Sequence, residues 1–532
     1  MRKVKSGVKR LVKLEVHKNA YYDSVTLMII SKELKKLAGV SQALVGMGTD
    51  LNRELARGSG LGAPGLDAVT ANDFFVAADC RDEAAFNACV SKVEELLTRR
   101  DDSGQAAYCP PTLEGARKLD PALNMAVISV PGKYAADVAQ SCLDRGIHVM
   151  LFSDNVTVEE EKALKEYAVA RKLLLMGPDC GTAIVNRVPL AFANAVRGGN
   201  IGIAAASGTG AQEVSSLIDQ LGGGVSQLLG TGGRDLKKEI GGLMMKQCLG
   251  ALIRDPATEV IVLISKPPAR EIADEILRIA RDAGKPAVVC FIGGDAEHIR
   301  SFGLTAALSL EDAAHKAVAL SRGEQPEDFL GFDMGGERAE ALAAEIAGRF
   351  APGQRYVRGF YTGGTLCDEA MKLMLDRLGH IHSNIPLRPE DRLDDARNGA
   401  SVAHTFLDFG DDAFTVGRPH PMIDPSLRAE RVARDGRDPA CAVIMTDCVI
   451  GYGSHPDPAG DLAAAIRTAR AGAEAEGRYL CCVASVCGTE ADPQSLFRTR
   501  KRLSDAGAAV LPSNAQAARF ALRVLAHLRE GS

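Results

Sequence analysis

Tryptophan is absent from this chain, and aromatic residues make up only 5% of its 532 residues. Glycine, in contrast, occurs 54 times, and alanine is plentiful. Few aromatic and many small side chains argue against an all-β sandwich, and they favour β-α-β units joined by tight turns. At this length we expect three or four domains.

No two of the 13 cysteines form a C-x-x-C pair. This absence argues against zinc, so we expect no bound metal. An odd number of cysteines without paired spacing is typical of a reducing compartment, and we therefore expect the chain in the cytoplasm. Cys180 could act as a nucleophile, although a lone cysteine beside proline and glycine more often has a structural role.

Long apolar runs and a strong excess of one charge are missing as well. No apolar run reaches 18 residues, so we expect no membrane-spanning segment. The first 13 residues carry six lysines and arginines but lack the apolar core of a signal peptide, and we interpret them as a solvated arm. The net charge of −5 does not indicate a nucleic-acid or membrane partner, so we expect a small-molecule substrate.

Two phosphate-binding motifs are also missing: G-x-x-x-x-G-K-[ST], and G-x-G-x-x-G after a strand. The chain has instead two turns of small residues at neighbouring strand ends. The first lies between an apolar run (201–206) and a helical pattern (211–221); the second follows an apolar run (225–229). Their residues are Ser207, Gly208, Thr209 and Gly210, and Gly232, Gly233 and Arg234.

A strand, a small-residue turn and a helix together direct free backbone N–H groups at an anion. Glycine allows a close approach of the backbone, and the helix dipole favours negative charge at its start. The two turns therefore predict one phosphate or carboxylate site. The alternative is a pair of tight turns that hold no ligand.

Residues 11–190 alternate between short apolar runs and helical patterns. This alternation predicts one mainly parallel, doubly wound sheet. The expected strands are residues 11–16, 43–46, 74–77, 125–130, 148–152 and 173–176. Residues 99–118 are polar with two prolines, and we expect an exposed loop there.

Residues 350–530 repeat the pattern of residues 198–325: strand, Gly-Thr turn, helix, strand, Gly-Asp turn. In the second copy the turn contains Thr362, Gly363, Gly364 and Thr365. A duplicated pair commonly packs about a pseudo-twofold axis. That arrangement would direct the helices that begin near Thr209 and Thr365 at one shared anion.

Residues 416–428 are polar and rich in proline, yet they follow a buried strand. Arg418 and Arg428 could bind a carboxylate or phosphate with two parallel hydrogen bonds. His420 could transfer a proton or accept a phosphoryl group. The alternative is a surface loop stiffened by proline.

Seven motifs together resemble the bacterial FdrA family, and they cover nearly the whole chain. They are residues 25–31, 152–156, 176–182, 205–210, 232–236, 361–366 and 415–425. The family is similar in turn to succinyl-CoA synthetase and the NDP-forming acyl-CoA synthetases. This resemblance implies an α/β fold with a Rossmann-like CoA-binding-type domain (11–195) followed by two flavodoxin-like ligase domains (198–325 and 350–530).

The chain departs from those synthetases at two loops. Their phosphohistidine loop is cut to residues 293–300, where His298 lacks the surrounding glycines. Their glycine-rich CoA loop is replaced by residues 18–24. No stretch resembles an ATP-grasp domain.

The resemblance implies a subunit of an oxamate carbamoyltransferase that uses carbamoyl phosphate or phosphate as substrate, with other subunits in the complex. The alternative is an acyl-CoA ligase subunit that acts through phosphohistidine with a separate ATP-grasp chain; CoA binds only in this alternative. A non-catalytic scaffold or metabolite sensor is the third possibility.

Under the first reading, the turns at Ser207–Gly210 and Thr362–Thr365 bind phosphate. Arg234, Arg418 or Arg428 binds the substrate carboxylate or stabilises developing charge, Arg428 being our choice for the carboxylate. His420 is a general acid or base.

Overall fold

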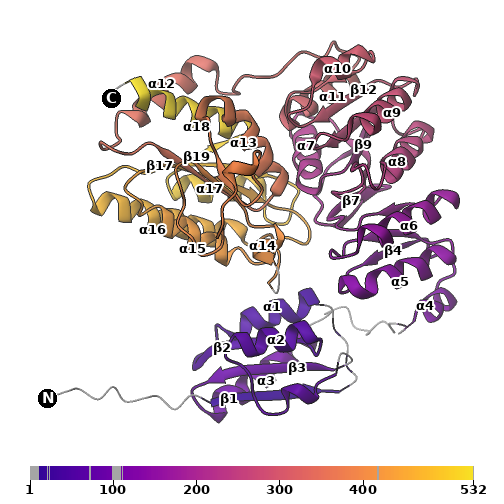
Figure 1. Cartoon of the computed structure of the whole chain (residues 1–532), viewed down its shortest axis with the longest axis vertical. Coiled ribbons are helices and arrows are strands. Elements are labelled where there is room, and N and C mark those ends of the chain that lie inside the picture. Colours follow the sequence, from indigo (N-terminus) through magenta and orange to yellow (C-terminus); the bar gives the residue numbers. More distant parts are fainter. Residues whose placement is uncertain are drawn as a thin grey trace. The chain divides into compact units, whose positions relative to one another are not determined.

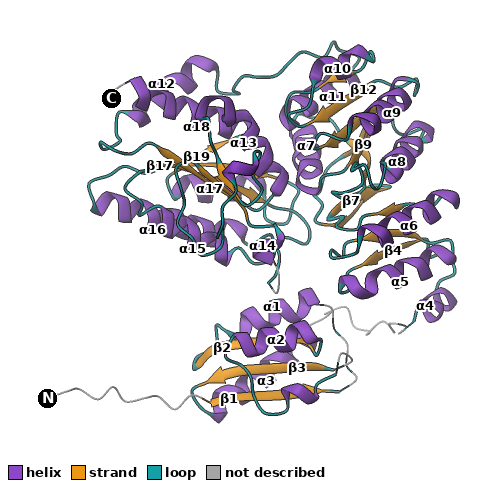
Figure 2. Ribbon diagram, in the orientation of Figure 1, coloured by secondary structure: helices purple, strands orange, loops and turns teal. Residues whose placement is uncertain are grey.

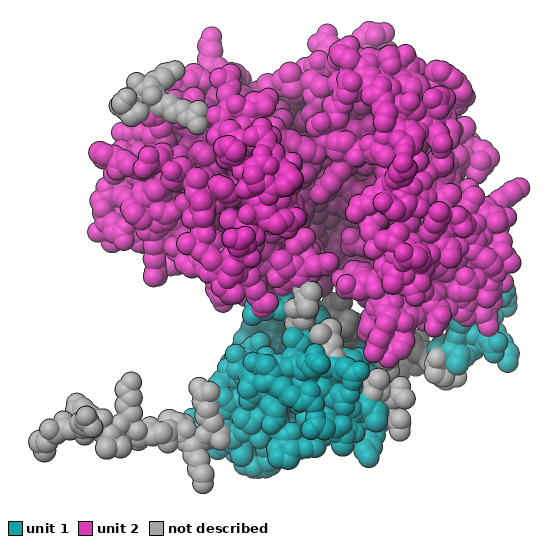
Figure 3. All heavy atoms as spheres, viewed as in Figure 1, with its two compact units in different colours: residues 1–123, 417–419 teal, residues 124–416, 420–532 magenta. Residues whose placement is uncertain are grey.

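The computed structural model describes residues 11–18, 20, 22, 24–70, 73–98, 110, 112–415 and 418–530. The chain forms two compact units, which Figure 3 shows in different colours. The first contains Met1–Leu123 and Gly417–Pro419, and the second contains Asn124–Val416 and His420–Ser532. Figures 1 and 2 show the helices and strands of each unit. No helix among the described residues is long and apolar enough to cross a membrane.

The first unit is a small antiparallel sheet with helices on it. Its strands lie in the order β1-β3-β2, and β3 pairs antiparallel with both neighbours. Alternate β3 residues face opposite sides: Phe74 and Val76 pack with α1 and α3, whereas Phe75 packs with residues of α2 and the loop after it. The elements are β1 (Leu11–His17), α1 (Ser24–Leu34), β2 (Val40–Met47), α2 (Asp50–Gly58), η1 (Leu66–Ala68), β3 (Phe74–Cys80), α3 (Glu83–Thr98) and α4 (Leu113–Leu119).

The prediction of one parallel sheet across residues 11–190 is therefore wrong. Local patterns mark strands and helices but do not show which strands pair, and here the first three strands pair only among themselves. Part of the loop expected over residues 99–118 is helix α4; residues 99–109 and 111 lie outside the described residues.

The second unit begins with a three-stranded parallel sheet of order β4-β5-β6. Its elements are β4 (Met125–Ile128), α5 (Gly132–Asp144), β5 (His148–Leu151), α6 (Val158–Ala170) and β6 (Leu175–Met176). The turn after its first strand is residues 129–131. Residues 18–24 follow β1 of the separate antiparallel sheet, and their replacement of a CoA loop stays a prediction. Strands β7 (Thr182–Val185) and β8 (Val188–Ala191) follow in the chain but belong to the next sheet.

A seven-stranded sheet follows, with the order β13-β12-β11-β9-β10-β7-β8. We call its β9–β13 part, with α7–α11, the first module. Its elements are β9 (Gly198–Ala205), α7 (Gly208–Gln220), β10 (Val225–Gly230), α8 (Leu243–Arg254), β11 (Val260–Ser265), α9 (Arg270–Arg281), β12 (Ala287–Phe291), α10 (Ala296–Ser301), β13 (Thr305–Ala306) and α11 (Leu310–Ser321).

The second module is a six-stranded parallel sheet of order β15-β16-β14-β17-β18-β19. Its elements are α12 (Gly336–Ala347), β14 (Tyr356–Tyr361), α13 (Gly364–Leu378), β15 (His382–Ser383), η2 (Pro389–Asp391), β16 (Thr405–Asp408), α14 (Asp412–Thr415), α15 (Ser426–Asp435), β17 (Cys441–Val449), α16 (Pro458–Ala475), β18 (Cys481–Cys487), α17 (Leu496–Asp505), β19 (Ala508–Leu511) and α18 (Asn514–Glu530). The strands of the two modules lie in the same spatial order relative to their order in the chain: β13-β12-β11-β9-β10 in the first module matches β19-β18-β17-β14-β16 in the second. This agreement confirms the predicted repeat.

The two modules pack through α7 and α11 of the first and α13 and α18 of the second, with one continuous apolar core. Two glutamates cross this interface reciprocally. Glu213 of α7 accepts a hydrogen bond from Asn514 N at the start of α18 (3.0 Å), and Glu369 of α13 accepts one from Leu310 N at the start of α11 (2.7 Å). Each is the sixth residue of its helix. This exchange is what a pseudo-twofold axis between the modules requires.

Candidate functional site

The first turns of α7 and α13 meet directly. Ser207 Oγ lies 2.7 Å from Thr365 Oγ1, and a Cβ atom on Gly363 would lie 2.8 Å from Thr209 Cγ2. The predicted convergence of the two helix starts is thus confirmed. We call this junction the cradle and define it by Ser207, Gly208 and Thr209 of the first module and Gly364 and Thr365 of the second.

Several backbone N–H groups at the cradle have no acceptor. Ser207 caps α7 by accepting from Gly210 N at 3.1 Å. Within the described residues, the amides of Gly208, Thr209, Gly364 and Thr365 donate to no protein atom. Unsatisfied amides and two helix dipoles favour an anion at this point. Phosphate binding here stays a prediction.

A carboxylate of the protein itself accepts hydrogen bonds from the backbone just before α13. Asp447, at the carboxyl end of β17, accepts hydrogen bonds from Thr362 N and Gly363 N, both at 2.8 Å. The sequence analysis predicted that Thr362 and Gly363 bind phosphate, but their amides instead donate to Asp447 and are not available to a ligand.

Arg428 neutralises this carboxylate from α15. Its Nη1 lies 2.6 Å from Asp447 Oδ1 and also donates to the Asp447 carbonyl at 2.6 Å. The Arg428 side chain is only 2% exposed. The prediction that Arg428 binds the substrate carboxylate is wrong, because its guanidinium is buried in an ion pair with Asp447.

A second carboxylate, that of Asp408 on β16, stands beside the cradle. Its Oδ1 accepts from Gly410 N at 2.8 Å, and its Oδ2 lies so close to Gly364 that a Cβ atom there would overlap it. Burial raises the pKa of Asp408 to about 7, against the opposing effects of the Gly410 hydrogen bond and the Lys266 charge. Asp408 can therefore gain or lose a proton near neutral pH. The sequence analysis missed it; the available signal was an acid at the end of a short, mainly apolar strand.

His420 packs against the same loop. A Cβ atom on Gly410 would lie 2.8 Å from His420 Nε2 and 3.2 Å from Asp408 Oδ1. His420 Nδ1 accepts from Met422 N at 3.2 Å, which assigns the proton of the neutral ring to Nε2. Burial lowers the pKa of His420 to about 4, so the ring is neutral at pH 7. His420 thus presents an N–H donor and does not act as a base.

The second predicted turn has a structural role. A Cβ atom on Gly232 would overlap the Pro178 carbonyl oxygen, and one on Gly233 would lie 3.9 Å from Asp179 Oδ2. Arg234 pairs with Glu161 at 2.9 Å and donates to the Val156 carbonyl at 2.7 Å. The turn thus packs on its neighbours, and Arg234 is held by an ion pair; anion binding by Gly232 and Gly233 stays a prediction.

The remaining predicted residues are Arg418, His298 and Cys180. Arg418 is exposed, belongs to the first unit, and has no ion pair within the described part of the chain. His298 is held at α9 by Asp274 and Arg270, each at 2.7 Å. Cys180 is buried, and burial raises the pKa of its thiol to about 12, which fits a structural role.

Three family models match parts of this chain. The model described as CoA-ligase matches residues 360–524, and the one described as CoA binding domain matches residues 197–294. The third, described as AllF, heavy metal-associated domain, matches residues 9–110. The chain thus has an α/β fold of the succinyl-CoA synthetase type. The CoA-binding match falls on the first module, whereas the sequence analysis assigned a CoA-binding-type domain to residues 11–195.

The uncharacterized protein YahF of Escherichia coli (strain K12) is 46% identical over 503 residues, which cover 94% of this chain and 96% of that protein. The alpha subunit of an ADP-forming succinate–CoA ligase of Aquifex aeolicus (strain VF5) is 28% identical over 177 residues, 32% of this chain and 56% of that subunit. The apo structure of a dinucleotide-forming acetyl-coenzyme A synthetase 1 of Ca. Korarchaeum cryptofilum has 17% identity and a TM-score of 0.32, with 76% of this chain and 83% of that chain covered.

The description of the third family model raises the question of a metal. Among the described residues, no group of three or more His, Cys, Asp or Glu side chains could hold one. Cys80 and Cys89 are buried in the first unit, and burial raises the pKa of the Cys89 thiol to about 12. His17 stacks on Phe74 at 4.3 Å between ring centroids. These residues do not fit a metal ion, because thiols with raised pKa values stay protonated.

Proposed function

Since this chain belongs to the family of the uncharacterized protein YahF and has CoA-ligase-type domains, we propose that it is a subunit of an acyl-transfer enzyme whose phosphate-linked step takes place at the cradle. The observation that carries this proposal is the 2.7 Å contact between Ser207 Oγ and Thr365 Oγ1. It brings two helix dipoles, each equivalent to about half a charge, to one point. The oxygens of a phosphate group there would share the four unpaired amides as hydrogen-bond donors.

The fold supports acid–CoA ligation as one candidate reaction. CoA-ligase and CoA-binding models match the two modules, and alpha subunits of succinate–CoA ligases are similar to part of the chain. In this reaction a partner chain supplies the nucleotide-dependent step. The CoA thiol then attacks the acyl carbon of an acyl phosphate at the cradle, so that the acyl group passes to CoA and phosphate leaves. A phosphohistidine is not available from His298, which is bound to α9.

The site geometry supports carbamoyl transfer as the second candidate. In this reaction a phosphate oxygen attacks the carbamoyl carbon of a ureido acid such as oxalurate, and the bond from that carbon to the acid's nitrogen breaks. Carbamoyl phosphate and oxamate result. Asp408, with its pKa of about 7, gives the leaving nitrogen its proton, and His420 Nε2–H stabilises the developing oxyanion. No covalent histidine intermediate is required.

The two reactions are separated by assays on the complex assembled with its partner subunits. Phosphate-dependent cleavage of oxalurate supports carbamoyl transfer; ATP- and CoA-dependent thioester formation supports ligation. Ser207→Asp and Thr365→Asp each add a negative charge to the cradle and should abolish either activity. Ser504→Asp, on the exposed surface of α17, is the matched control.

Activity that survives both cradle substitutions would overturn the proposed site. Absence of both activities from a correctly assembled complex would favour a scaffold or a metabolite sensor instead.

A further inference from the structure

A cavity lies at the end of the second module opposite the cradle. It has a volume of about 420 Å³ and is lined by residues at the amino end of β14, by His404 just before β16, and by the last turns of α13 and α18. Helix α13 runs from Thr365 at the cradle to Leu378 at this cavity. Its 15 residues at roughly 1.5 Å each separate the two sites by about 22 Å. The cavity is therefore not part of the proposed active site.

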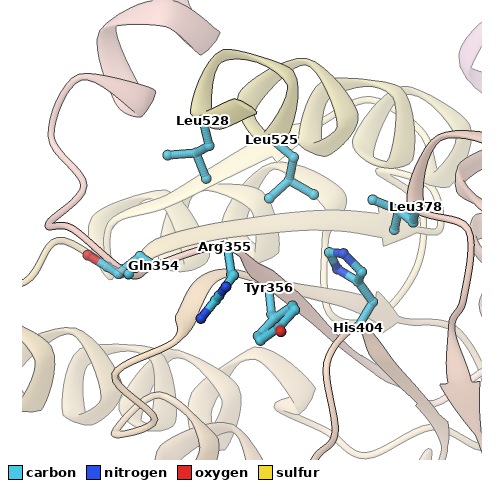
Figure 4. Close-up of a pocket in the computed structure, with 8 residues that line it drawn as sticks. Gln354, Arg355, Tyr356, Leu378, His404, Leu525 and Leu528 are labelled. Carbon is cyan, nitrogen blue, oxygen red and sulfur yellow. The ribbon is translucent and has the colours of Figure 1, made fainter. Parts of the chain in front are cut away.

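One side of the cavity is apolar. Figure 4 shows Leu525 and Leu528 of α18 above Tyr356, with Leu378 of α13 at one end. Leu528 and Leu378 are only partly buried, so apolar surface is left in contact with solvent there. The volume lies within the range of small-molecule pockets, which is roughly 300–1,000 Å³.

The other side carries one cation. The Arg355 guanidinium lies 5.4 Å from the centre of the Tyr356 ring and is exposed. Within the described residues it has no ion pair and no side-chain hydrogen bond. An arginine in this state can bind a carboxylate with two parallel hydrogen bonds.

The two helices that line the cavity disfavour a ligand with more than one negative charge. The cavity lies at the carboxyl-terminal turns of α13 and α18, which carry partial negative charge. A phosphate, with about two charges, would meet a single arginine, since the other lining side chains are Gln354, Tyr356, His404 and three leucines. A single carboxylate on an apolar body matches both sides of the cavity.

We propose that this cavity binds a small apolar monocarboxylate, whose carboxylate pairs with Arg355 and whose apolar body lies between Tyr356 and the leucines of α13 and α18. The inference is independent of the reaction at the cradle. It assigns a second ligand site to the chain.

The test is calorimetric titration of the full chain with 2-naphthoate. We expect binding at one site per chain, and at least tenfold weaker binding of the uncharged isostere 2-naphthamide. Arg355→Gln should weaken naphthoate binding at least tenfold, because it removes the cation that pairs with the carboxylate; its contact with the Tyr356 ring is lost as well. Leu528→Trp, which fills the cavity, should abolish binding.

Arg254→Gln is the matched control, since Arg254 is an exposed arginine on α8 in the other module. It should bind naphthoate as the unaltered chain does. Equal affinity for the amide, unchanged binding in Arg355→Gln or Leu528→Trp, or no binding of naphthoate at millimolar concentration would each overturn the proposal. Circular dichroism of each variant establishes that it is folded.

Discussion

The two modules share one strand order but differ at the residues that flank their helix starts. Strand pairing aligns Ala205 with Ile264 and Gly230 in the first module. In the second module the equivalent Tyr361 pairs with Asp408, and the preceding Phe360 pairs with Thr446, the residue before Asp447. Two acids in one module thus stand where the other has isoleucine and glycine.

Under the proposed function, this difference gives the two modules different roles at the cradle. In the first module the start of α7 has no neighbouring carboxylate at these positions, so its amides remain open to an external anion. In the second module, Asp447 accepts the hydrogen bonds of the backbone amides just before α13, and Asp408 adds a carboxyl group that titrates near neutral pH. Under the proposed function, both modules offer amides to the anion, and the second module adds a group for proton transfer.

The largest effect is expected for Asp447→Ala. It leaves Arg428 buried without its partner, and removal of one member of a buried pair costs about 3–5 kcal/mol. Urea denaturation followed by circular dichroism measures this loss. Ile264→Val at the equivalent position of the first module is the control and should cost about 0.5–1.5 kcal/mol. A loss below that of the control would show that the ion pair does not stabilise the second module.

Next in size is the effect of Asp408→Asn on catalysis. Loss of a general acid should lower kcat of the assembled complex about 100-fold, equivalent to about 2.7 kcal/mol. The unaltered enzyme should lose activity as the pH rises through about 7, because the acid form of Asp408 disappears. The variant should lack this limb of the pH profile. A profile that keeps the limb would assign it to another group.

A smaller effect is expected at the module interface. Burial raises the pKa of Glu213 from its ordinary value of 4.5 to about 7, so the folded chain binds this proton more tightly than the unfolded chain. The resulting stability is fully present below pH 4.5 and is lost as the pH rises to about 7.

Glu213→Gln should therefore raise the Tm at pH 8 by a few degrees, roughly 2–5 °C, and change it little at pH 5. Its amide oxygen can still accept from Asn514 N. Scanning calorimetry at both pH values measures the difference, with Glu345→Gln on the exposed face of α12 as control. Equal Tm changes at the two pH values would exclude a titrating Glu213.

The smallest effect is expected for Ser207→Ala. It removes the side-chain cap of α7 and its contact with Thr365, and loss of such a cap costs about 1 kcal/mol. The equivalent residue of α13 is Gly363, which has no side-chain cap to lose. Denaturant titration measures the cost; a value near zero would mean that the amide of Gly210 finds water equally well.

Much of the fold could be predicted because it depends on neighbours in the chain. The Gly-Thr turns and the helical patterns after them placed the starts of α7 and α13 within a few residues, and the repeated pattern indicated that they converge. The pairing of β1, β2 and β3 into a separate antiparallel sheet could not be predicted in this way, because an apolar run does not show which strand it joins.

The sequence by itself determined the α/β class, the duplication and the two small-residue turns, since turn chemistry and apolar periodicity act over a few residues. Only the tertiary structure decided what each charged group does. Asp447 lies 84 residues from the Gly363 amide that it accepts from, and burial moves the pKa values of Asp408 and His420 in opposite directions. Such assignments depend on which distant residues share a buried volume, because desolvation and hydrogen bonding set the charge of a side chain there.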